Sequence, residues 1–79
     1  MQQFRLGDSG PVVAEISALL SRLGLVDASG SVFDEATDQA VREFQQRRGL
    51  SVDGIVGPET YAALAAARWR LGDRLLSLA

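Results

Sequence analysis

Apolar residues recur at the spacing of an α-helix in three stretches of the chain. The first stretch places its apolar residues on one helical face: Val12, Val13, Ile16, Leu19, Leu20 and Leu23. Its opposite face is expected to carry Glu15, Ser17, Ser21 and Arg22. The second stretch has an apolar stripe of Ala36, Ala40, Val41 and Phe44, and the third turns Tyr61, Leu64 and Ala65 inward. The pattern predicts an all-α domain, a compact three-helix bundle.

Proline and glycine mark the ends of these helices. Pro11 and Pro58 stand at first helical positions, where a missing amide hydrogen costs nothing. Gly24 and Gly49 follow the first two helices and can adopt the left-handed conformation that ends a helix. The expected N-cap residues are Asp8 and Ser9 for the first helix and Asp34 for the second.

Between the second and third helices the sequence predicts a tight turn. The segment 51–57 contains Asp53-Gly54, flanked by β-branched residues that are too few for more than a stub of strand. Leu50, directly after the glycine stop, is expected to pack back on the last turn of the second helix.

The chain also contains an internal repeat. Residues 19–25 align with residues 44–50, and residues 32–41 align with residues 55–64, which places Thr37 on Thr60. The repeated unit is helix, glycine stop, loop and helix, with the second helix shared by both copies. Because one copy cannot bury its apolar face alone, two overlapping copies are expected to make one core.

Composition limits the chemistry of such a domain. Its 79 residues, 47% of them hydrophobic, suffice for one domain with a small core. The absence of His and Cys excludes disulfides, thiolate nucleophiles, Ser-His-Asp relays and zinc sites with imidazole or thiolate ligands. The carboxylates Asp34, Glu35 and Asp38 crowd a helix start, where they complement the helix dipole. We expect no catalytic residue, no cofactor and no metal site.

Charge and hydropathy limit the partners. A net charge of −2 argues against nucleic acid, which needs a concentrated basic surface. No apolar run approaches the ~20 residues that span a bilayer, and residues 1–10 lack the apolar segment of a secretory signal. The sequence therefore predicts no nucleic-acid partner and no membrane insertion.

One ordered pattern covers most of the chain. It consists of Phe44-Gln45, then Gly49-Leu50, then Asp-Gly-x-x-Gly-x-x-Thr at residues 53–60. This pattern resembles the peptidoglycan-binding domain that is appended to many bacterial cell-wall hydrolases, and residues 6–13 resemble the segment that leads into its first helix. The resemblance extends from about Leu6 to Leu64 and is far more specific than a single short motif.

The resemblance implies a non-catalytic module over residues 4–67 that targets a linked hydrolase or regulatory domain to peptidoglycan. Residues 68–79 would be a connector or the truncated start of a following segment, because Trp69 to Leu76 echoes residues 4–8. This stretch is similar to the connector after the first of two tandem binding domains in actinobacterial N-acetylmuramoyl-L-alanine amidase-like proteins. A frayed extension of the third helix is the alternative interpretation.

The same resemblance implies a monomeric module at the cell wall, linked to an amidase or a related hydrolase. The alternative is a protein-interaction or regulatory domain of the same fold that does not bind the wall. Because residues 1–10 carry no signal, a cytoplasmic location also stays open.

Six residues are the expected ligand contacts: Gln45, Arg48, Asp53, Gly54, Thr60 and Tyr61. Arg48 would pair with stem-peptide carboxylates, and Tyr61 would lie against a sugar face. Structural roles are the alternative: Asp53 caps its own turn, Gly54 supplies backbone freedom, Gln45 bonds to loop backbone, Thr60 serves the helix start and Tyr61 joins the core. The first repeat lacks the Asp-Gly and the later Gly, so the second loop is the preferred site.

Overall fold

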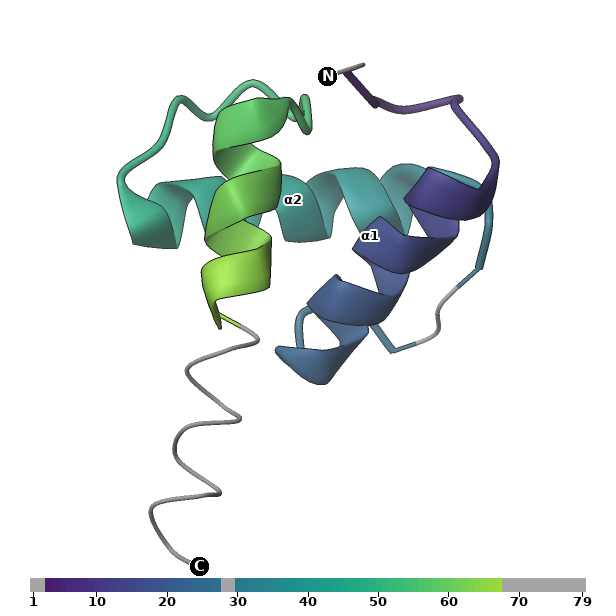
Figure 1. Cartoon of the computed structure of the whole chain (residues 1–79), viewed down its shortest axis with the longest axis horizontal. Helices are drawn as coiled ribbons and strands as arrows, with labels where there is room; N and C mark the ends of the chain where they lie inside the picture. The colour runs from purple at the N-terminus through teal and green to yellow at the C-terminus, as the bar shows by residue number, and fades with distance from the viewer. Residues whose placement is uncertain (1–2, 28–29, 68–79) are drawn as a thin grey trace, which may run out of the picture.

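The computed structural model describes residues 3–27 and 30–67 of the chain. Helix α1 spans Pro11–Arg22, helix α2 spans Glu35–Arg48, and a third helical segment covers residues 58–67. In Figure 1, α2 runs across the view, and α1 and the segment 58–67 cross it near its two ends. The three-helix prediction is confirmed. The expected connector at residues 68–79 lies outside the described residues.

The helix ends agree with the sequence except at the start of α1. Asp34 caps α2, since its carboxylate accepts the Thr37 N–H at 2.9 Å and the Thr37 hydroxyl at 2.8 Å. The N-cap of α1 is Gly10, which makes no side-chain cap bond, so the prediction of Asp8 or Ser9 as the cap is wrong. The Asp8 carboxylate instead accepts the Arg5 N–H at 2.9 Å. Asp8 and Ser9 belong to a segment whose backbone pairs with residues 31–33, and α1 begins only after it.

Both glycine stops adopt the expected geometry. Gly24 has φ 76° and Gly49 has φ 71°, in the left-handed region. Beyond each glycine, the chain folds back onto its helix: the Leu25 N–H donates to the Leu20 carbonyl at 3.0 Å, and the Leu50 N–H donates to the Gln45 carbonyl at 2.9 Å. The predicted packing of Leu50 against the core is confirmed.

The buried core draws on all three helices and both connecting loops. Its members are Phe4, Val13, Ile16, Leu19, Leu20, Phe33, Ala40, Val41, Phe44, Val56, Leu64 and Ala67. Phe4 is held in place by paired backbone bonds with Val56, 3.1 Å and 2.8 Å long. This bridge and a second one between Ser9 and Val32 are isolated, so residues near Val56 form the expected stub.

Four positions differ from the amphipathic prediction. One is Ala65, which is half-buried and outside the core, whereas Ala67 of the same segment is buried. Ser17 is buried because it lies four residues after Val13 and three before Leu20, along the axis of the buried stripe. Val12 and Ala36 are exposed, since both lie in a first helical turn at the edge of the core. In α2, the buried stripe includes the polar residues Thr37 and Gln45 in addition to apolar ones.

The repeat is visible in the burial of equivalent positions. Phe33 and Val56, Thr37 and Thr60, and Val41 and Leu64 are three aligned pairs, and all six side chains are buried. Thr37 and Thr60 each lie in the first turn of a helix. The alignment of the two copies thus reflects two structurally matched loop-helix units around one core.

Gly54 provides the sharpest test of the loop geometry. Its φ is 74°, and an added Cβ would lie 2.6 Å from an Asp38 carboxylate oxygen and 2.8 Å from an Arg42 guanidinium nitrogen. Gly49 has a similar φ, but an added Cβ there meets nothing within 4 Å. We expect Gly54→Ala to lower the free energy of unfolding by about 1–3 kcal/mol. The loss should exceed that of Gly49→Ala, where the only cost is that of placing a residue with a Cβ in the left-handed conformation. Urea unfolding of both variants measures this, and equal losses would contradict the close approach at Gly54.

Candidate ligand-binding site

The side-chain amide of Gln45 holds the loop 53–60 against α2. Gln45 is 1% exposed. Its Nε2 group shares two N–H protons among three acceptors, Asp53 Oδ1 at 3.0 Å, the Ile55 carbonyl at 3.0 Å and Thr60 Oγ1 at 3.2 Å. Its Oε1 atom accepts the backbone N–H groups of Asp53 at 3.2 Å and Gly54 at 3.1 Å. Every polar atom of this amide is therefore used within the protein.

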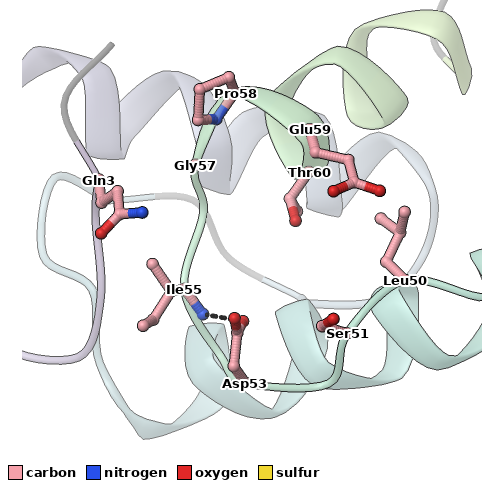
Figure 2. Close-up of a pocket in the computed structure, with 9 residues that line it drawn as sticks. All are labelled: Gln3, Leu50, Ser51, Asp53, Ile55, Gly57, Pro58, Glu59 and Thr60. Atoms are coloured by element: carbon pink, nitrogen blue, oxygen red, sulfur yellow. Dashed lines mark hydrogen bonds between the residues drawn. The ribbon is translucent and has the colours of Figure 1, made fainter.

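Asp53 closes the turn from the other side. Its Oδ1 atom accepts the Ile55 N–H at 2.9 Å, the bond drawn in Figure 2. This N–H lowers the pKa of Asp53 most, the Gln45 amide lowers it further, and Arg42 adds a smaller Coulombic effect. The carboxylate is consequently ionised at neutral pH. Arg42 also reinforces the turn, since it pairs with Asp38 at 3.2 Å and donates to the Asp53 carbonyl at 3.4 Å.

The loop held in this way forms one wall of an open pocket of about 190 Å³. Its lining consists of Gln3, Leu50, Ser51, Asp53, Ile55, Gly57, Pro58, Glu59 and Thr60. In Figure 2, the side-chain oxygens of Asp53, Ser51 and Thr60 border a common opening, with Glu59 and Leu50 beside it. The pocket thus combines hydrogen-bonding oxygens with apolar walls.

A second hollow of about 240 Å³ lies between the first loop and α2. Its lining consists of Gly24, Leu25, Val26, Asp27, Ala36, Gln39, Ala40 and Glu43. Here the residue that aligns with Gln45 is Leu20, which is fully buried and apolar. The first loop therefore has no side-chain amide at the position from which Gln45 organises the second.

The six expected contact residues fall into three groups. Asp53 and Thr60 line the pocket, whereas Gln45 and Gly54 are buried behind it and shape the loop. Arg48 is exposed and stands 5.5 Å from the centre of the Phe44 ring, outside the pocket lining. Tyr61 is half-buried against the core, its hydroxyl donates to the Glu15 carboxylate of α1, and it does not line the pocket either.

Several lining residues did not follow from the sequence. Gln3 reaches the pocket because its neighbour Phe4 pairs with Val56, a contact between distant segments. Glu59 lies in the first turn of the segment 58–67, where an acid complements the helix dipole, so its residue type alone does not mark it as a pocket residue. Ser51 lies in the predicted turn, two residues before Asp53. This closeness in sequence was the signal that could have placed Ser51 at the site.

The pocket presents groups that can form hydrogen bonds with a ligand. Among the described residues, no group of three or more acids lies close enough to hold a metal ion. In the same part of the chain, no helix is both long and apolar enough to cross a membrane. The pocket offers carboxylates, hydroxyls and an amide, which can orient a ligand by hydrogen bonds.

Comparison with known proteins gives a consistent match over the core of the chain. The family described as "Putative peptidoglycan binding domain" matches residues 9–64. The chain is 48% identical to the N-acetylmuramoyl-L-alanine amidase CwlM of Mycobacterium tuberculosis, over 91% of this chain and 20% of that protein. It is 39% identical to the spore cortex-lytic enzyme of Halalkalibacterium halodurans, over 80% of this chain and 19% of that protein. It spans about a fifth of the length of these curated relatives.

Solved structures agree with the sequence matches. The SleB N-terminal domain superimposes with a TM-score of 0.80 at 36% identity, covering 84% of this chain and 92% of that one. A peptidoglycan-binding protein from Clostridioides difficile, in complex with glutamine hydroxamate, has a TM-score of 0.77 at 40% identity. That match covers 80% of this chain and 40% of the other.

Replacing Gln45 tests the network that shapes the pocket. We expect Gln45→Leu to lower the free energy of unfolding by at least about 2 kcal/mol, because each buried polar group left without a partner costs roughly 1–3 kcal/mol. The matched control is Gln46→Leu, an exposed position on the same turn, where a change within about 0.5 kcal/mol is expected. Urea unfolding compares the two, and similar effects would show that the Gln45 bonds contribute nothing specific.

The lowered pKa values of Asp34 and Asp53 predict acid sensitivity. Hydrogen bonds hold both folded-state values below the ordinary 3.8, with the Thr37 N–H as the main cause at Asp34 and the Ile55 N–H at Asp53. Their stabilisation is complete above the unfolded pKa and is lost as the pH falls through the folded pKa. The double variant Asp34→Asn, Asp53→Asn should therefore lose less stability than the native chain on acidification from pH 5 to pH 2. Parallel unfolding profiles would refute this assignment.

Proposed function

Because the chain belongs to the peptidoglycan-binding domain family, we propose that it holds a linked domain on the bacterial cell wall through the pocket beside Asp53 and Thr60. The family match over residues 9–64 carries the proposal, since it includes α1, α2 and the whole of the loop that Gln45 holds. The chain is a binding module and not a catalytic domain. The pocket lies in the repeat that retains the complete family pattern.

In this proposal some residues contact the ligand and others hold the loop in place. Asp53 and Thr60 face the ligand at the pocket wall, and Gln45 and Gly54 keep that wall in one position. Ser51, Glu59 and Gln3 extend the contact surface around them. Arg48 and Tyr61 would take part only with a ligand that extends beyond the pocket, toward the end of α2 or toward α1.

The linked domain in this proposal is a cell-wall hydrolase. The relatives named as an amidase and as a cortex-lytic enzyme are each about five times longer than the matched segment, which leaves room for a separate catalytic domain. We place the protein outside the cytoplasm, where peptidoglycan lies, and take the module to act as a monomer. A shallow pocket suffices for this role, because tethering to a second module raises the effective concentration of each.

Blocking each hollow in turn tests the proposed site. Ser51→Trp fills the mouth of the pocket, and Gln39→Trp places the same side chain at the second hollow; both native residues are exposed. In sedimentation with insoluble peptidoglycan, we expect the native chain and Gln39→Trp to be retained and Ser51→Trp to bind at least about tenfold more weakly, a loss of about 1.4 kcal/mol.

Two outcomes would contradict the proposal. Loss of binding in Gln39→Trp but not in Ser51→Trp would move the site to the first loop. Absence of native retention at low salt would favour a protein partner for this fold. Unfolding midpoints of both variants confirm that any loss of binding does not come from loss of structure.

A further inference from the structure

The charges of the pocket beside Asp53 and Thr60 are all negative. Asp53 and Glu59 are its ionisable lining residues, and none of the nine lining residues is basic. No ion pair engages Glu59 among the described residues. Arg42 pairs with Asp38 and donates to the Asp53 carbonyl, so it offsets the charge of Asp53 only in part. Two carboxylates therefore face the ligand with no basic side chain in the lining to offset them.

Two helix ends modify this charge without reversing it. The segment 58–67 begins at the pocket, and its amino-terminal dipole partly offsets Glu59. That dipole corresponds to roughly half an elementary charge, which cannot neutralise two carboxylates. The carboxyl-terminal dipole of α2, just before Leu50, adds potential of the opposite sign, and Arg48 in the same turn counters it.

The uncharged walls fit the same class of ligand. Leu50, Ile55 and Pro58 supply apolar surface, while the Ser51 and Thr60 hydroxyls and the Asp53 carboxylate supply acceptors. An aliphatic chain that ends in an ammonium group matches this combination, because its methylenes pack on apolar surface and its three donors need oxygen acceptors. Only Oδ1 of Asp53 is used by the bonds within the turn.

Peptidoglycan offers three kinds of group to such a pocket: sugar hydroxyls and amides, stem-peptide carboxylates, and the free side-chain amines of stem peptides. Two carboxylates that are only partly offset repel a ligand carboxylate and favour a cation. We propose that the pocket binds the free side-chain ammonium group of a stem peptide, between Asp53 and Glu59. This inference rests on the proposed wall binding, and it differs from the expected pairing of Arg48 with stem-peptide carboxylates.

The test compares native peptidoglycan with peptidoglycan whose free amines have been acetylated. Acetylation keeps the glycan and the stem carboxylates but removes the cation. We expect the native chain to sediment with native walls and to bind acetylated walls about tenfold more weakly or worse, the loss typical of a charge-assisted hydrogen bond.

A pair of charge-matched variants separates this site from general repulsion by the more negative acetylated wall. Glu59→Gln removes a carboxylate in the pocket, and Glu35→Gln removes an exposed carboxylate in the first turn of α2. We expect Glu35→Gln to retain the full preference for native walls. Glu59→Gln should bind native walls about tenfold more weakly and should show little further loss on acetylated ones.

The possible results distinguish the two proposals. Equal retention of the native chain on both walls would overturn the ammonium site and leave wall binding intact. An equal preference for native walls in both variants would overturn it as well, since the effect would then be general repulsion. Absence of retention on native walls would overturn wall binding and, with it, the ammonium site. Matching unfolding midpoints of the two variants establish that each is folded.

Discussion

The structure of the second loop depends on one buried amide. Gln45 makes five hydrogen-bonding contacts with four residues of the segment 53–60, and the contacts with Gly54 and Thr60 are buried. Since an unpaired buried polar group costs roughly 1–3 kcal/mol, any displacement of the loop leaves several groups without partners at once. The loop therefore has one favoured position, and the position of Asp53 and Thr60 at the pocket follows from it. Gly54 fits the same constraint, because its φ of 74° favours glycine and an added Cβ would force the Asp38 and Arg42 side chains to move.

The two repeats show what this amide adds to the fold. Leu20 and Gln45 occupy aligned positions, are fully buried, and accept the same backbone bond from the residue after the glycine stop. Leucine contributes apolar burial to the core, whereas glutamine contributes a defined loop. The helix-loop-helix unit thus forms with either residue, and the polar version also produces a hydrogen-bonded pocket wall. This difference supports a division in which the first repeat completes the core and the second binds.

Local sequence signals predicted most of the fold, and contacts between distant segments account for the differences. Pro11, Pro58, Gly24 and Gly49 act through their own backbone preferences, so the helix ends could be read directly. The cap of α1 could not be predicted from local signals, because Asp8 is held by the Arg5 N–H and by backbone pairing with Phe33. The same limit applies to the site. Asp53 and Thr60 belong to a local pattern, while Gln3 arrives through the Phe4–Val56 bridge. Glu59 also suits a helix-dipole role in the first turn of the segment 58–67, so its residue type does not mark it as a pocket residue.

Hydrogen exchange measured residue by residue tests the central claim that the Gln45 amide fixes the loop to α2. The Gly54 N–H is buried and bonded to Gln45 Oε1, so its exchange should require the global unfolding of the domain, with the same free energy as the most protected amides of α2. The side-chain amide protons of Gln45 should exchange at similarly low rates. Rapid exchange of Gly54 while the α2 amides stay protected would show that the loop opens independently, and would contradict the account.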